Sequence, residues 1–282
     1  MPEQEILTKK EAMEFLGLDS KTFDNYFKHA DEFKCLERPN GRGFFKFNKA
    51  ELKKWQENYN WRNIELDLDD YALCLDFALA QHLRGYVMSD WGTGRQREFG
   101  QKITNWVKGQ LAEIAVQKFF KKEFNCEVNL DFEIHENIVP QDIIGVKENS
   151  NFREPRIGVG IKSSKPKNAY LVLGENEVTL EERRSEIYIF CRPDIPDDHL
   201  LRLTKDKIIE AVKNKPHFDT YKNNIPSFEN MYCEIAGYCS INELERVTSI
   251  PGQEFENGYR YVKKSGALHR SRQKWQELID RL

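Results

Sequence analysis

Apolar side chains recur with helical spacing through the middle of the chain, from Ile103 to Lys122. One face of this stretch collects apolar residues three and four positions apart: Ile103, Val107, Leu111, Ile114, Ala115 and Phe119. This spacing predicts an amphipathic helix that packs one broad side against a core. Glu113 falls at the edge of the apolar side. Its carboxylate either serves a partly buried site or extends past the apolar border into water.

Two shorter stretches, 140–145 and 156–165, have the composition of β-strands. Alternation in the second separates apolar residues from small or polar ones: Ile157, Val159 and Ile161 on one face, Gly158, Gly160, Lys162 and Ser164 on the other. Asp142 lies in the first stretch. We therefore expect two strands joined by a polar, charged loop, one with an aspartate and one ending in a lysine. Such a pair suits a site for a phosphodiester better than it suits a core.

Further apolar runs predict strands at 186–191 and 232–238 and helices at 71–87 and 201–212. The chain ends in a segment with apolar residues spaced as on one helix face: Trp275, Leu278 and Leu282. Strands interspersed with helices predict an α/β (α+β) fold with a mixed central sheet flanked by helices.

The beginning of the chain has the signals of a separate small unit. Thr8 is placed to cap a helix, with Glu11 completing a capping box, and Ser20 to cap a second helix after a glycine turn. Residues 38–47 predict a hairpin and its return strand, and Asn48 opens a last helix. Helix, turn, helix and hairpin in this order are typical of a DNA-reading unit.

The order resembles the winged helix-turn-helix of excisionases and MerR-type regulators. The resemblance implies a recognition helix and a wing near a phosphate or the minor groove. It assigns DNA contact to Ser20, Lys21, Thr22, Asn25 and Tyr26 on the helix and to Arg42 on the wing. A structural or dimerising unit would have the same pattern. We expect this unit at 1–58, a polar, acidic linker at 59–70 and a larger domain at 71–282.

The 282-residue chain has a net charge of −3, which argues against a protein that coats nucleic acid by charge alone. Its basic residues are nevertheless clustered. Residues 34–54 hold seven Lys or Arg against two Glu, and residues 260–274 hold six Lys or Arg and no acid. These clusters either grip DNA at chosen places or are solvated faces. Arg95 and Arg97, in a glycine-punctuated stretch, either clamp a DNA backbone or belong to an ordinary loop.

No apolar run approaches the roughly 20 residues of a membrane-spanning helix, and the acidic start lacks the apolar core of a signal peptide. The six cysteines are scattered, without a paired spacing, which indicates free thiols in a reducing compartment. We therefore expect a cytoplasmic protein without a membrane partner.

The segments around Asp142 and Lys162 resemble the PD-(D/E)xK nuclease superfamily, and within it the type II restriction endonucleases. Asp142 matches the first acid of the motif, and the run Ile161-Lys162-Ser163-Ser164 matches the strand that ends in its lysine. The helix around Glu113 looks like the one that precedes the first catalytic strand. The resemblance implies an endonuclease that uses Mg²⁺ and cuts double-stranded DNA as a homodimer. Its implied metal ligands are Asp142, Glu113 and the carbonyl of Ile161, with Lys162 orienting or deprotonating the attacking water.

Gly160 departs from the family pattern, which has Asp or Glu two residues before the lysine. Three explanations are open. Glu113 takes the role of the missing acid, which we favour; another acid, Glu154 or Glu175, enters the site; or the domain binds DNA without cutting it. The last explanation gives the alternative function, a non-catalytic DNA-binding regulator with a degenerate nuclease fold. A third function, a protein-interaction scaffold, predicts no salt-sensitive affinity for DNA.

Overall fold

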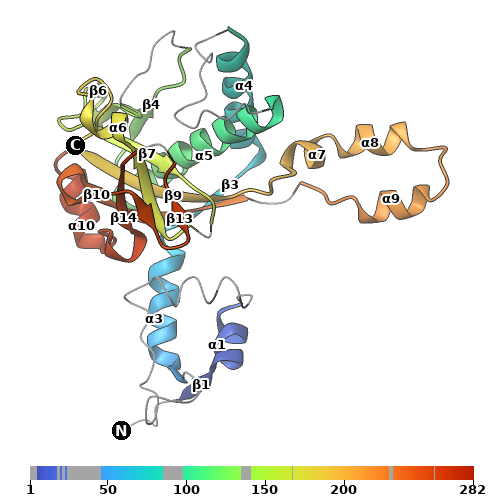
Figure 1. Ribbon diagram of the computed structural model, residues 1–282, viewed down its shortest axis with the longest axis horizontal. Coiled ribbons are helices and arrows are strands. Elements are labelled where there is room, and N and C mark those ends of the chain that lie inside the picture. Colours follow the sequence, from blue (N-terminus) through green and yellow to red (C-terminus); the bar gives the residue numbers. More distant parts are fainter. Residues whose placement is uncertain are drawn as a thin grey trace.

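The computed structural model of the chain describes residues 5–17, 20, 23, 46–84, 98–134, 141–166, 168–228, 231–256 and 258–282. Its main sheet has four strands in the order β3–β10–β9–β7 (Figure 1). Their bounds are Asn63–Leu66 for β3, Met231–Ser240 for β10, Ile187–Asp194 for β9 and Val159–Ser163 for β7. β10 runs antiparallel to β3 and β9, whereas β7 runs parallel to β9. The mixed sheet predicted from the sequence is confirmed.

Long helices pack on this sheet and supply much of the main core. The helix predicted at 103–122 is α5 (Phe99–Phe124), whose apolar side is buried against the strands. α4 (Leu68–Arg84) packs along α5, and the C-terminal α10 (Arg272–Ile279) buries Trp275 edge to face against Phe119, with ring centroids 5.0 Å apart. None of the helices within the described ranges is long and apolar enough to span a bilayer.

Two smaller sheets and a short ribbon contain the remaining strands of the main domain. One sheet has the order β4–β5–β6 and the other the order β11–β14–β8. The bounds are β4 Val128–Leu130, β5 Ile143–Glu148, β6 Asn151–Arg153, β8 Tyr170–Gly174, β11 Glu245–Val247, β14 Arg260–Lys264, and β12 Ser249–Ile250 with β13 Gln253–Glu254 in the ribbon. The polar loop predicted after the strand of Asp142 contains β6, which pairs back on β5. The strands associated with Asp142 and Lys162 therefore belong to different sheets.

A helical arm lies between β9 and β10 and projects from the core (Figure 1). It consists of α7 (His199–Leu203), α8 (Lys205–Ala211) and α9 (Phe218–Asn224). The stretch predicted as helical at 201–212 is mostly helical, but it forms two short helices, α7 and α8, divided at Thr204. The hydroxyl of Thr204 donates to the carbonyl of Leu200 (2.9 Å), a side-chain bond of the kind that bends or interrupts a helix.

Both helices described in the N-terminal unit begin at the predicted caps. At the start of α1 (Lys9–Leu16), Thr8 Oγ1 accepts a hydrogen bond from the amide of Glu11 (3.3 Å), and Glu11 accepts one from the amide of Thr8 (2.7 Å). At the start of α3 (Lys49–Asn60), Asn48 Oδ1 accepts hydrogen bonds from the first amides of the helix. These side chains satisfy donors that the helix itself leaves unpaired.

The return strand predicted at 44–47 is β2 (Lys46–Asn48), and it pairs antiparallel with β1 (Ile6–Thr8). The unit has its own core: Leu7, Ala12, Leu16, Phe23, Phe47, Leu52 and Trp55. Phe23 and Phe47 meet edge to face, with ring centroids 5.2 Å apart. A separate core of this kind agrees with a distinct N-terminal unit.

Most of the predicted DNA contacts lie outside the described residues: Lys21, Thr22, Asn25, Tyr26, Arg42, Arg95 and Arg97. Ser20 is described and exposed, and its hydroxyl accepts a hydrogen bond from Lys9 Nζ (3.4 Å). The predicted recognition helix and wing therefore stay predictions.

The predicted linker at 59–70 is not a linker: residues 59–60 end helix α3, and most of the rest belongs to the main domain. β3 lies within it and pairs with β10, and its alternate residues Ile64 and Leu66 are buried in the main core. Arg62 is buried as well, and its guanidinium donates to the carbonyl of Ile235 (2.7 Å). The polar composition did not indicate a strand, because only every second residue of β3 faces the core and the residues between them are polar.

Candidate active site

Asp142 lies just before β5 and is hydrogen-bonded to β7, an edge strand of the main sheet. Its amide donates to the carbonyl of Val159 (3.2 Å), and its carboxylate accepts a hydrogen bond from the amide of Ile161. The amide and carbonyl of one residue in a strand point to the same side. The carbonyl of Ile161 therefore faces the side on which Asp142 lies, as a shared metal ligand would.

Lys162 follows Ile161 on β7 and pairs with a carboxylate that the sequence analysis did not identify. Its Nζ lies 3.0 Å from Glu177 Oε1, and the two side chains are 33% and 32% exposed. Glu177 belongs to α6 (Glu175–Thr179), the short helix after β8, and its Oε2 accepts a hydrogen bond from the amide of Gly174 (2.8 Å). Both oxygens of Glu177 are thus engaged, which fixes the carboxylate beside Lys162.

The two acids considered as replacements lie elsewhere. Glu175 pairs with the guanidinium of Arg246 (2.7 Å), and Glu154 is an exposed residue between β6 and β7. A local signal for Glu177 was present: Gly174 is a helix N-cap, and an acid three residues later turns back toward the cap. That signal places Glu177 at the end of β8 but does not show that Lys162 is near.

Glu113 is buried in the middle of α5, with 8% of its surface exposed. Gln110, one turn earlier, donates from Nε2 to Glu113 Oε1 (2.9 Å). Burial raises the pKa of Glu113 well above its ordinary value, the charge of Asp142 raises it further, and Lys162 opposes the shift. The interpretation of Glu113 as a border carboxylate that extends into water is therefore wrong.

The charges of Asp142 and Lys162 act on each other, and both act on Glu113. Burial raises the pKa of Asp142, against the effects of Lys162 and of the Ile161 amide. Burial alone would lower the pKa of Lys162, but the charges of Glu177 and Asp142 more than offset it, and the pKa is raised. A hydrogen bond from the Ile161 amide therefore holds Asp142 beside Lys162 on β7, and the charge of Asp142 acts on Glu113 of α5.

Gly160 has no room for a side chain. A Cβ atom there would lie 2.9 Å from Ser185 Oγ and 3.2 Å from the ring of Tyr188, which is its partner residue on β9. The hydroxyl of Tyr188 accepts a hydrogen bond from the amide of Ser185 (3.1 Å) and donates to the carbonyl of Glu177 (2.8 Å). Tyr188 therefore occupies the space beside Gly160 and anchors the helix that carries Glu177.

The cluster has oxygen ligands of the kind that Mg²⁺ prefers. The charge of Asp142 raises the pKa of the buried Glu113, and a divalent cation would offset this repulsion. Near them, Gln110 Oε1 and Gln141 Oε1 are buried acceptors without a hydrogen-bond partner in the described part of the chain. No three His, Cys, Asp or Glu side chains within the described ranges form a group that could hold a metal. Mg²⁺ often takes one or two carboxylates and keeps several waters, so Glu113, Asp142 and the Ile161 carbonyl fit it.

No protein-family model matches the chain, and searches among curated proteins and solved structures give no significant match. A functional proposal therefore rests on the geometry of the described residues alone. Two features matter most for it: the hydrogen bond that holds Asp142 beside Lys162, and the absence of space beside Gly160.

Proposed function

We propose that the protein is a Mg²⁺-dependent endonuclease that hydrolyses phosphodiester bonds in double-stranded DNA, with a nuclease core of the PD-(D/E)xK kind. The observation that carries this proposal is the position of Asp142: its carboxylate accepts a hydrogen bond from the Ile161 amide, next to Lys162, and its charge acts on the buried Glu113. Burying a carboxylate such as Glu113 is unfavourable, and groups whose pKa is perturbed in this way are concentrated at functional sites. The helix-turn-helix pattern of residues 1–58 supports DNA as the substrate. By resemblance, the active form is a homodimer of restriction type that cuts both strands at a short site.

Lys162 supplies positive charge in this proposal. Its raised pKa keeps the ammonium protonated at neutral pH, and the ion pair with Glu177 fixes its position. A protonated lysine orients the attacking water and stabilises negative charge that develops on the phosphate. Of the two predicted roles of Lys162, orientation is therefore favoured over deprotonation of the water.

Glu113 and Asp142 would hold the metal ion together with the carbonyl of Ile161. When bound, the ion supplies positive charge to the phosphate and lowers the pKa of the water that attacks it. Both carboxylates are oriented by their own partners, Glu113 by Gln110 and Asp142 by the amide of Ile161. Ligands held by such outer partners lose little freedom when they bind a metal.

The alternative is a non-catalytic DNA-binding regulator with a degenerate nuclease fold. Gly160 favours it, because β7 has no acid two residues before Lys162 and Tyr188 leaves no space for one. A regulator would bind DNA with or without Mg²⁺ and leave both strands intact. The ion pair of Lys162 with Glu177 favours the endonuclease, because it provides a carboxylate beside the lysine from another element.

Incubation with phage DNA of mixed sequence separates the two functions. The endonuclease gives discrete fragments with Mg²⁺ and none with EDTA, and Asp142→Asn and Lys162→Ala abolish cutting. Lys147→Ala, on β5 outside the cluster, is the matched control and keeps the activity. Salt-dependent binding without cutting, on methylated and unmethylated DNA alike, contradicts the endonuclease and supports the regulator.

A further inference from the structure

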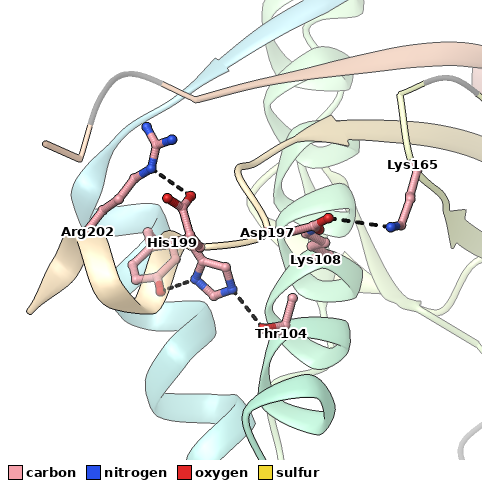
Figure 2. Close-up of polar contacts among 8 residues, drawn as sticks. Thr104, Lys108, Lys165, Asp197, His199 and Arg202 are labelled. Atoms are coloured by element: carbon pink, nitrogen blue, oxygen red, sulfur yellow. Dashed lines mark hydrogen bonds and ion pairs between the residues drawn. The ribbon is translucent and has the colours of Figure 1, made fainter. Parts of the chain in front are cut away.

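A second polar cluster lies where the chain passes from β9 into the helical arm (Figure 2). Asp197 accepts from two lysines: Lys108 Nζ lies 2.7 Å from its Oδ1, and Lys165 Nζ lies 3.5 Å from its Oδ2. The side chain of Lys108 is only 17% exposed, whereas those of Lys165 and Asp197 are 72% and 73% exposed. The cluster thus presents one exposed carboxylate between two ammonium groups.

Both lysines lie on or next to elements that carry the candidate site: Lys108 on α5, and Lys165 just after the end of β7. Lys108 precedes Glu113 on α5 by five residues, which is about 7.5 Å along the helix axis. Lys165 follows Lys162 by three residues, a span of at most about 11 Å. Because β7 and β9 are parallel, their carboxyl ends lie at the same end of the sheet. The segments with Lys165 and Asp197 both leave the sheet there. Phosphates succeed one another every ~3.4 Å of axis along a DNA strand, so the cluster lies within a few phosphates of the site.

Buried hydrogen bonds of His199 hold the segment of Asp197 in place. Its Nδ1 lies 2.6 Å from the hydroxyl of Tyr71, and its Nε2 lies 3.0 Å from Thr104 Oγ1. His199 has no exposed surface, and these bonds connect the start of the arm to α4 and α5 (Figure 2). The position of Asp197 therefore does not depend on its ion pairs alone.

We propose that Lys108 and Lys165 form a binding position for a backbone phosphate of nucleic acid, and that Asp197 occupies it in the free protein. The inference rests on the proposed function, because it takes DNA as the ligand. A phosphate presents charged oxygens that accept hydrogen bonds from the same two ammonium groups. An exposed ion pair contributes little to stability, so a phosphate can displace Asp197. The mostly buried Lys108 is already ordered and loses little freedom on binding.

The test is binding of a fluorescent DNA duplex in EDTA, followed by anisotropy over a range of salt concentrations. Asp197→Asn is expected to bind several-fold more tightly, with a slope of log K against log salt steeper by about 0.9 for each phosphate gained. Lys165→Gln, at an exposed position, and Lys108→Gln are expected to lower both the affinity and the slope, and to abolish the gain from Asp197→Asn. Glu127→Gln is the matched control, because it releases Lys147 from an ion pair of 3.1 Å elsewhere and leaves the affinity unchanged.

Unchanged or weaker binding by a folded Asp197→Asn variant would overturn the inference. The ion pairs of Asp197 would then serve only to hold its segment in place. Absence of DNA binding in all the variants would overturn it as well. If inorganic phosphate at matched ionic strength stabilises Asp197→Asn against heat as much as the duplex does, the ligand is free phosphate and the assignment to nucleic acid is wrong. Cleavage has no part in this assay. A protein whose Asp197→Asn variant binds more tightly but never cuts keeps the phosphate position and loses the endonuclease.

Discussion

Lys162 Nζ lies 3.0 Å from Glu177 Oε1, so a carboxylate reaches the lysine from helix α6 rather than from the lysine's own strand. Gly160, two residues before Lys162, has no side chain, and the ring of Tyr188 lies against it. The hydroxyl of Tyr188 donates to the carbonyl of Glu177 (2.8 Å). The absence of an acid on β7 and the presence of one from α6 are therefore parts of one packing arrangement.

Glu177→Gln is expected to lower the pKa of Lys162, because burial then acts with less opposition from neighbouring charge. At a fixed alkaline pH, a lower pKa leaves more of the amine unprotonated, so Lys162 reacts faster with an acylating reagent, by about tenfold for each unit. Mass spectrometry of peptides measures the rate, with Lys165 as the internal reference. Glu175→Gln, on the same helix but paired elsewhere, serves as the control. An unchanged rate at Lys162 would show that Glu177 does not govern the lysine.

Gly160→Ala is expected to destabilise the protein by about 1–3 kcal/mol, the usual cost of overpacking. The added Cβ would meet Ser185 Oγ at 2.9 Å and the ring of Tyr188 at 3.2 Å. Gly109→Ala is the matched control: its Cβ would have nothing within 4 Å, and alanine favours the helix by roughly 0.5–1 kcal/mol. Urea denaturation measures both variants. If Gly160→Ala matches the intact protein in stability, the space beside Gly160 is not the reason for the missing acid.

Elements specified by local chemistry could be predicted from the sequence. Thr8 and Asn48 mark helix starts because a cap bonds to amides within three residues. α5 was predicted because the apolar residues of its buried side recur with helical spacing from Ile103 to Phe120. β3 was missed because the residues that pair with it, on β10, are more than 160 positions away in the chain.

The same distinction applies to the candidate site: local patterns predicted some of its residues but not the contacts between distant segments. Asp142 and Lys162 were found from a motif within their own segments, and Glu113 from its place on a helix face. The contact between Lys162 and Glu177 depends on how α6 packs against β9 through Tyr188, and no local spacing encodes that. Its prediction would require the tertiary arrangement itself.

Protonation of His199 is expected to weaken the fold in acid. Burial, with a smaller effect of the Lys108 charge, lowers the pKa of His199 from 6.5 to about 4. Between these values the unfolded chain binds more protons, so the free energy of unfolding is fully retained above about pH 6.5 and falls as the pH drops toward 4. The loss reaches at most about 3 kcal/mol.

Urea midpoints at about pH 7 and about pH 5 measure this effect. His199→Gln is expected to lose less stability between the two pH values than the intact protein. His217→Asn, at an exposed position of the arm, is expected to follow the intact protein. A His199→Gln variant with the intact pH dependence would show that another group titrates.

Mg²⁺ is expected to raise the melting temperature of the intact protein without DNA, because it binds the folded site and not the unfolded chain. At a concentration 100 times its dissociation constant, the gain is about 2.7 kcal/mol. Glu113→Gln and Asp142→Asn are expected to lose the shift, whereas Glu148→Gln, an exposed acid on β5, keeps it. Calorimetry with and without the ion measures all four proteins. Equal shifts in the intact protein and both cluster variants would place the cation elsewhere.

The decisive measurement for the proposed nuclease is the single-turnover rate of DNA cleavage with Mg²⁺ in four variants: Glu113→Gln, Asp142→Asn, Lys162→Ala and the Asp142→Asn/Lys162→Ala double variant. Residues that act as one catalytic unit give non-additive losses. If the three residues act as one unit, each single variant loses about 100-fold or more in rate, and the double variant loses little further. Cutting at the intact rate by any of the three single variants, or an intact protein that binds DNA and leaves it whole, would contradict the proposal.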